Sequence, residues 1–141
     1  MSGRFIAFIA VIASLLVATT VNAAQTPAPQ GASVYIISPA NGESVVSPFK
    51  VRFGLTGMGV APAGVDITKT GHHHLLIDTT PLLHDPIPRD SHHLHFGNGE
   101  TETTLSLPPG KHTLQLLLGD KNHVPFKPAI VSREIIIYVT D

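Results

Sequence analysis

The chain has 141 residues, of which 9 are Lys or Arg, 10 are Asp or Glu and 9 are His, and its formal net charge is -1. This length allows one modest hydrophobic core, and the near-neutral charge excludes the basic surface of a nucleic-acid-binding domain. The absence of cysteine excludes disulfides, thiolate metal sites and cysteine nucleophiles. Histidine is concentrated between positions 72 and 95, and this concentration is the main indication of function.

Residues 1–24 have the pattern of a secretory signal peptide. Arg4 supplies a positive charge, an apolar run extends from Phe5 to Ala18, and small side chains at Val21 and Ala23 suit a cleavage site. The apolar run is short for a membrane span, and no second one follows it. We therefore expect export to the periplasm or the medium, and a mature protein that does not span a membrane.

The rest of the chain predicts a single all-β domain. Residues 25–32 contain Pro and Gly and predict a flexible leader, followed by one domain over residues 33–141. Short β-type runs then alternate with turn residues, and no segment keeps a helical period for three turns. We expect strands at residues 34–37, 49–55, 72–78, 93–96, 101–107, 111–118 and 131–140, with loops at 60–71 and 79–91. This series is typical of an immunoglobulin-like antiparallel β-sandwich of seven to eight strands.

Two of the expected strands carry a pair of histidines separated by one residue. Successive side chains of a strand point to opposite faces, so His72 and His74 share one face, as do His93 and His95. Two residues span about 6.6 Å along a strand, a gap that two imidazoles can close around one ion. If the two strands are neighbours, the four histidines can together hold a divalent transition metal.

The tight-turn sequence Gly97-Asn98-Gly99 predicts a hairpin that folds residues 101–104 back along residues 93–96. A two-residue loop places Glu100 or Glu102 opposite His95, as a further ligand or as a hydrogen-bond acceptor. A three-residue loop places threonines there instead. We favour the two-residue loop, so Glu100 and Glu102 join the four histidines as candidate site residues.

Other polar residues are assigned mainly structural roles. His73 is expected to be a packed, hydrogen-bonded residue at the edge of the core, and His84 is expected to be solvated in the proline-rich loop. His112 follows a Pro-Pro-Gly corner, where sandwich domains often place a tyrosine that hydrogen-bonds back to the backbone. Asp120 and His123 lie in the turn before the last strand, and each can be a ligand or a turn former.

A site rich in imidazole with one carboxylate suits Cu(II), Zn(II) or Ni(II). We therefore expect an exported binding module without enzymatic activity that holds copper or zinc. The alternative is a non-catalytic module for envelope or protein interaction, with structural histidines. A histidine-ligated metal oxidoreductase is a third interpretation. The sequence identifies no protein partner.

Three motifs also carry a resemblance. They are GHHHLLID at 71–78, HLHFGNGETE at 93–102 and LPPGKHTLQLLLGDKNHVP at 107–125. Together they resemble a family of small secreted bacterial domains of unknown function, over residues 34–141. The resemblance implies an exported one-domain protein without an assigned activity, and it supplies no ligand residues. Many members of that family have histidine at the position of Phe126, where this chain departs from the pattern.

Overall fold

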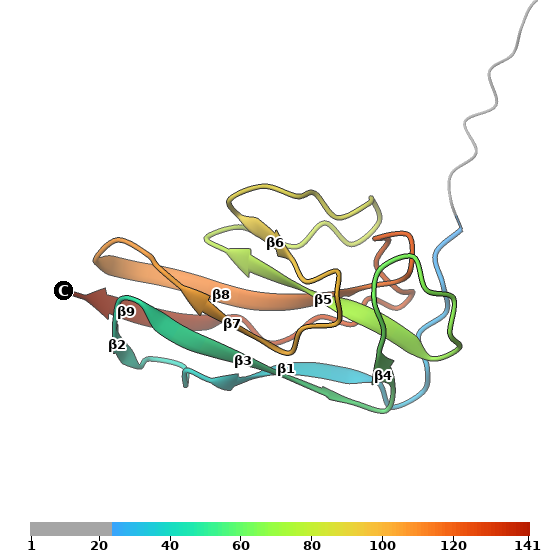
Figure 1. Ribbon diagram of the computed structural model, residues 1–141, viewed down its shortest axis with the longest axis horizontal. Coiled ribbons are helices and arrows are strands. Elements are labelled where there is room, and N and C mark those ends of the chain that lie inside the picture. The colour runs from blue at the N-terminus through green and yellow to red at the C-terminus, as the bar shows by residue number, and fades with distance from the viewer. Residues whose placement is uncertain (1–23) are drawn as a thin grey trace, which may run out of the picture.

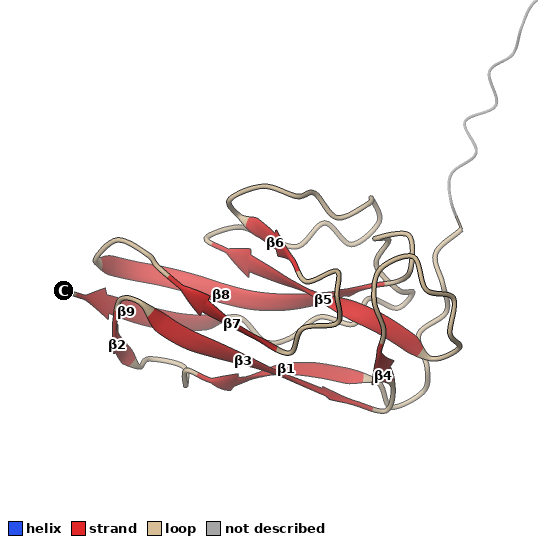
Figure 2. Ribbon diagram, viewed as in Figure 1, coloured by secondary structure: helices blue, strands red, loops and turns tan. Residues whose placement is uncertain are grey.

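The computed structural model of the chain describes residues 24–141, so the expected signal peptide lies outside the described residues except for its last position. The described part is all-β, and its strands form two sheets that stack as a sandwich (Figures 1 and 2). The predicted fold class, a β-sandwich, is confirmed. None of the residues 24–141 belongs to an apolar helix long enough to cross a membrane.

Within residues 24–141 there are nine strands: β1 (Ser33–Ser38), β2 (Ser44–Val46), β3 (Phe49–Thr56), β4 (Gly59–Val60), β5 (Thr70–Ile77), β6 (His93–His95), β7 (Glu102–Leu105), β8 (Gly110–Gly119) and β9 (Ile135–Thr140). Seven of them correspond to predicted strands. The other two, β2 and β4, are very short and pair in parallel with β9 and β5, respectively. These two strands were not predicted because they depend on pairing with distant segments rather than on a local sequence pattern.

The two sheets differ in size. The smaller has the order β1-β3-β7, and the larger has the order β2-β9-β8-β5-β4, with β6 also paired to β5. Strand β5 pairs with β8 along one edge, and β4 and β6 share its other edge. Strand β5 therefore has partners on both sides, and it lies in the interior of the larger sheet.

Alternation of apolar and polar residues builds the core between the sheets. In β3, Val51 and Phe53 are buried while Lys50 and Arg52 are exposed, as the sequence predicts. Strand β5 is different because it is buried on both faces. In Figure 1 the segment between β5 and β6 lies on the side of β5 away from β1 and β3, where it covers the outer face. A small second apolar cluster forms there from Leu76, Leu117 and Ile87, the last contributed by that segment.

The predicted hairpin between residues 93–96 and 101–104 is wrong. A turn does form, with the Gly99 N–H donating to the Phe96 carbonyl at 3.3 Å. The chain then passes to the other sheet, where β7 pairs with β3 and Glu102 lies opposite Arg52. Two basic side chains on β3 attract Glu102, with Lys50 Nζ at 2.8 Å and Arg52 Nε at 3.4 Å. Turn chemistry predicted where the chain reverses, but not which strand it joins.

Residues 25–28, expected to be part of a flexible leader, are held against two loops. Gln25 Nε2 donates to the Leu83 carbonyl at 2.8 Å, and Thr26 Oγ1 donates to Asp120 Oδ2 at 2.6 Å. A bridge between Pro27 and Lys127 continues the contact. The beginning of the domain therefore packs beside the loop that follows β8.

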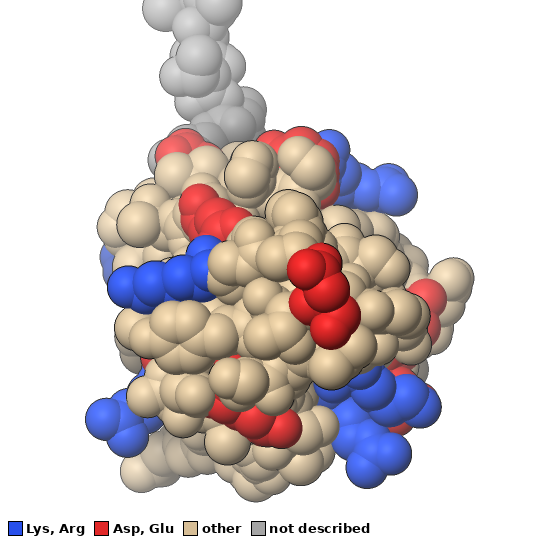
Figure 3. Space-filling model, turned by 90° about the vertical axis from the view of Figure 1, so that its left-hand side faces the viewer, with Lys and Arg blue, Asp and Glu red and all other residues tan. Residues whose placement is uncertain are grey.

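Charge is dispersed over the surface shown in Figure 3. Basic and acidic side chains are interspersed on this end of the molecule, and most of it carries neither. This face shows no extended basic surface.

Candidate metal centre

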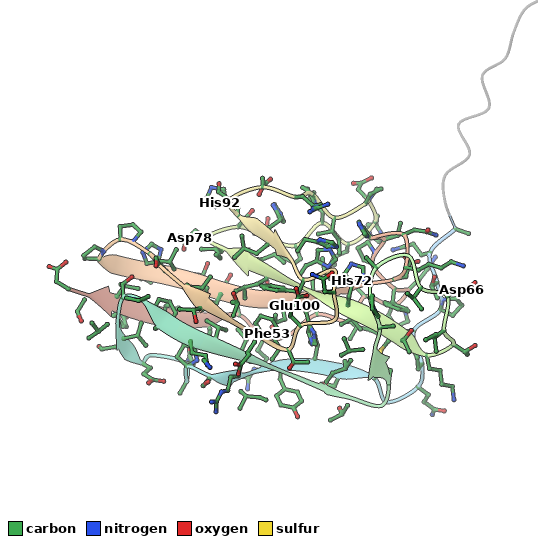
Figure 4. The ribbon with its side chains drawn as sticks, viewed as in Figure 1. Phe53, Asp66, His72, Asp78, His92 and Glu100 are labelled. Atoms are coloured by element: carbon green, nitrogen blue, oxygen red, sulfur yellow. The ribbon has the colours of Figure 1, made fainter. Side chains whose placement is uncertain are left out.

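The three consecutive histidines of β5 are all buried, with exposed fractions of 1% for His72, 0% for His73 and 0% for His74. His73 points between the sheets, where its ring centroid lies 5.1 Å from that of Phe53. His72 and His74 point to the opposite, outer face, as strand alternation requires. Figure 4 shows His72 on β5 and Phe53 on β3, a strand of the smaller sheet.

Strand β6 brings a third histidine to the same place. It runs antiparallel to β5 with His95 opposite His74. The ring centroid of His95 lies 5.0 Å from that of His72 and 5.1 Å from that of His74. One ring nitrogen from each of these three residues lies within 4.8 Å of the other two. The two histidine motifs thus meet on neighbouring strands, as the proposed site requires.

A fourth imidazole, that of His123, reaches this cluster from the loop after β8. Its ring centroid lies 4.6 Å from that of His95, 5.0 Å from that of His72 and 6.1 Å from that of His74. The backbone of His123 has φ 64°, a left-handed conformation that is uncommon outside glycine. Sequence reasoning left its role open, because nothing local shows where a turn residue with this backbone directs its side chain.

The loop is shaped by Asp120. Its Oδ1 accepts hydrogen bonds from the backbone N–H groups of Asn122 at 2.8 Å and Val124 at 3.1 Å, and the His123 N–H donates to the Asp120 carbonyl at 2.9 Å. Asp120 is itself buried, and its Oδ2 accepts the hydrogen bond from Thr26. Asp120 therefore acts here as a turn former, and it fixes the backbone that carries His123.

Ring nitrogens of the cluster are buried without hydrogen-bond partners among the described residues. They are His72 Nε2, His74 Nδ1 and Nε2, His95 Nε2 and His123 Nδ1. A buried polar atom without a partner costs about 1–3 kcal/mol, so several of them in one place require an explanation.

The electrostatics of the cluster favour the neutral form of His72, His74 and His95. Burial, followed by the neighbouring His123 and His95, lowers the pKa of His72 to about 4 against the opposing charge of Asp120. Burial and the other three rings lower the pKa of His74 to about 2. The pKa of His95 is also lowered, first by burial and then by the charge of Arg89, while Glu100 opposes the shift. Neutral imidazole is the form that binds metal ions.

Three of the six residues proposed from the sequence lie outside the cluster. His93 is on β6 opposite Leu76, two residue pairs further along than His95, and its Nδ1 lies 2.8 Å from Asp90 Oδ1. Glu100 accepts hydrogen bonds from the backbone and side-chain nitrogens of Asn98.

Glu102 is in the smaller sheet, paired with two basic residues of β3. The structure thus brings together His72, His74 and His95, adds His123, and places His93, Glu100 and Glu102 elsewhere.

The remaining histidines have other surroundings. His112 Nε2 lies 2.8 Å from the Pro108 carbonyl, which is the bond back to the backbone that the sequence suggested. Its Nδ1 lies 2.7 Å from Asp78 Oδ2, at the end of β5 far from His72 in Figure 4. His84 is exposed, as expected. His73 is packed in the core, but without the expected hydrogen bond among the described residues.

These features define a small β-sandwich domain with a buried histidine cluster on the outer face of its larger sheet. The chain belongs to the family described as a domain of unknown function, DUF4399, whose family model matches residues 51–140. The resemblance inferred from the three motifs, to a family of unknown function, is therefore confirmed. Comparison with curated proteins finds no match, and neither does comparison with solved structures.

Proposed function

We propose that this domain is an exported binding module for one divalent transition-metal ion, copper or zinc, and that His72, His74 and His95 are ligands. The observation that carries the proposal is the convergence of three ring nitrogens within 4.8 Å of one another on paired strands. Nitrogens bound to one ion at about 2.0–2.1 Å lie about 3–4 Å apart, so small side-chain movements suffice.

Ligation also accounts for one unpartnered nitrogen in each ring. A cluster of buried imidazoles without hydrogen bonds loses stability, whereas an ion among them accepts the lone pair of one nitrogen from each ring. The low pKa values of His72 and His74 support the proposal because these rings need not lose a proton near neutral pH to bind. Imidazole ligands suit copper and zinc better than the hard cations Ca²⁺ and Mg²⁺.

The test is a calorimetric titration of the tag-free protein, purified from the exported fraction and stripped with chelator, with Zn(II) and with Cu(II) at pH 7.5. We expect one ion per chain and a dissociation constant below about 100 μM. His95→Gln should weaken binding at least about tenfold. His95 is only partly buried, so this variant should keep the fold.

His84→Gln is the matched control, because it also removes one histidine but from an exposed position. It should bind metal as the unchanged protein does. Absence of binding below about 100 μM, or equal weakening in both variants, would overturn the proposal and favour a non-catalytic interaction module with structural histidines.

A further inference from the structure

We propose that His123 is a fourth ligand and that the site is a closed, tetrahedral four-histidine centre that takes Zn(II). This inference rests on the proposed metal binding and specifies its coordination. The starting observation is that His123 Nδ1 is buried beside the three-histidine group and has no hydrogen-bond partner in the described part of the chain.

The spacing of the four rings fits a tetrahedron. Imidazoles bound to one ion through nitrogens at about 2.0–2.1 Å in a tetrahedral arrangement have ring centroids about 5 Å apart in all pairs. Five of the six pairs in the cluster have centroids 4.6, 4.7, 5.0, 5.0 and 5.1 Å apart. The sixth, between His74 and His123, is 6.1 Å. Among the described residues, ring nitrogens of His72, His74 and His95 lie within 4.8 Å of one another without one from His123, so the ring of His123 must move about 1 Å toward His74 to complete the tetrahedron.

A square-planar arrangement fits less well. It requires two trans pairs with centroids about 6 Å apart, and these two pairs must share no residue. If His74 and His123 are one trans pair, His72 and His95 must be the other, yet their centroids are 5.0 Å apart. Cu(II) and Ni(II) favour tetragonal geometry, whereas Zn(II) has no such preference and is usually tetrahedral. The geometry therefore favours Zn(II).

The position of His123 is supported by the structure around it. The Asp120 carboxylate holds the turn through two backbone N–H groups, and Thr26 holds the carboxylate. The His123 carbonyl accepts a hydrogen bond from the Ile87 N–H at 2.8 Å, which ties this loop to the segment that covers the cluster. A left-handed backbone at a residue other than glycine is unfavourable, and it persists here because these contacts fix it.

The proposal has a consequence for chemistry. Three histidines alone leave a position at the ion for water or substrate, as in catalytic zinc sites, whereas four protein ligands close the site. The domain would then hold the ion without activating water.

Co(II) is the probe for the test because it substitutes for Zn(II) and because four-coordinate Co(II) absorbs visible light much more strongly than six-coordinate Co(II). The metal-free full domain is loaded with Co(II) alone, and its visible spectrum is recorded at neutral pH. We expect the intense four-coordinate band in the unchanged protein. In His123→Ala we expect Co(II) to bind, with a weaker band, because water molecules entering the opened position raise its coordination number to five or six.

Free imidazole provides the second readout. Added to Co(II)-loaded His123→Ala, it should occupy the opened position and restore the intense band, and it should leave the spectrum of the unchanged protein as it was. Zn(II) affinity should fall more than about 100-fold in His123→Ala, since even residues outside the ligand set commonly account for about 10–100-fold. His93→Ala, a neighbouring histidine outside the cluster, is the matched control and should keep the band.

The outcomes separate the two proposals. If the unchanged protein binds neither Co(II) nor Zn(II), the proposed function fails. If it binds both, and His123→Ala keeps the intense band and the affinity, the fourth ligand is wrong and the three-histidine site stands. Loss of the band in His93→Ala would also overturn the assignment of His123.

Discussion

Neighbouring residues in the motif GHHHLLID have opposite surroundings. His73 packs against Phe53 between the sheets, and burial lowers its pKa to about 4. His72 and His74 meet other imidazoles on the outer face. Side-chain direction alone makes this difference, since the three residues have the same chemistry and nearly the same burial. A triple histidine in a strand is therefore one core residue and two candidate ligands.

At the same scale, His112 and Asp78 form an ion pair whose effect on stability depends on pH. Burial opposes protonation of His112, but the hydrogen bond and the charge of Asp78 outweigh it and raise the His112 pKa above 6.5. Burial likewise opposes ionisation of Asp78, but hydrogen bonds from His112 and Thr113 bring the pKa of this carboxyl below 3.8.

The signs of the two shifts define a pH window. A raised His112 pKa adds stability that is fully present below the unfolded value near 6.5 and is lost as pH rises through the folded value. A lowered Asp78 pKa adds stability that is present above the unfolded value near 3.9 and is lost as pH falls through the folded value. The pair therefore stabilises the fold most between about pH 4 and 6.5.

We predict that His112→Gln removes part of this pH dependence. From pH 5.5 to 8.5, the free energy of unfolding of the unchanged protein should fall by about 0.5–1 kcal/mol more than that of the variant, a modest value because Asp78 is partly exposed. Urea denaturation at both pH values measures it. His84→Gln should behave like the unchanged protein, and identical pH profiles for His112→Gln and the unchanged protein would contradict the prediction.

At the scale of elements, the close approach of β8 to His74 requires a glycine. A Cβ placed on Gly119 would lie 2.7 Å from His74 Cε1 and 3.3 Å from Ile87 Cδ1. His74 and Ile87 are both buried, so neither side chain can move far without displacing others. Gly119 thus leaves room for the His74 ring beside the end of β8.

We predict that Gly119→Ala lowers the free energy of unfolding by about 1–3 kcal/mol, because overpacking displaces buried side chains. It should also weaken Zn(II) binding, since the ring of His74 must move. Chemical denaturation and metal titration measure the two effects. Gly59→Ala is the matched control: it is also a strand glycine, but its Cβ would meet only Thr70 Cγ2, at 3.6 Å. Equal losses in the two variants would show that the site does not depend on this contact.

The long strands could be predicted from sequence because their signals are local. Alternation in β3 and apolar runs in β8 and β9 indicate strands whatever they pair with. The pairing of β6 could not be predicted, because the turn at Gly99 is compatible with a hairpin as well as with a crossing to the other sheet. The face shared by His72 and His74 followed from alternation alone.

The same limit applies to the candidate site. Placing Glu100 and Glu102 beside His95 depended on the hairpin that does not form. Strand alternation places His93 on the same face as His95, as a ligand requires. Its ring nitrogen Nδ1 instead contacts the carboxylate of Asp90, three residues earlier. His123 reaches the cluster through a left-handed backbone fixed by Asp120, and neither the conformation nor its direction is visible in a turn sequence. Strand alternation therefore could not predict the position of side chains that tertiary contacts place.

At the scale of the whole molecule, the histidine cluster and the main core are separate. The core between the sheets is built from residues such as Val51, Leu75, Leu116 and Ile137, whereas the cluster lies on the outer face of the larger sheet. The sandwich does not need an ion to bury its largest apolar surface, so we expect the metal-free domain to be folded.

We predict that Zn(II) raises the stability of this folded domain. At a free concentration about 100 times the dissociation constant, binding adds about 2.7 kcal/mol, and Tm should rise by roughly 10 °C for a domain of this size. Scanning calorimetry with and without Zn(II) measures the shift, and chelator should reverse it. His95→Gln should show little of it, and a comparable shift in that variant would place the ion elsewhere.

The cluster joins parts of the chain that are far apart in sequence: β5, β6 and the loop after β8. An ion bound there would cross-link the chain, closing loops of about 20 and 30 residues. A disulfide that closes a loop of that length stabilises the fold by roughly 3 kcal/mol, because it lowers the entropy of the unfolded chain. This chain has no cysteine with which to form one. Histidine coordination of Zn(II) would provide the same restraint. A chelator would remove this cross-link, whereas a reductant would not break it.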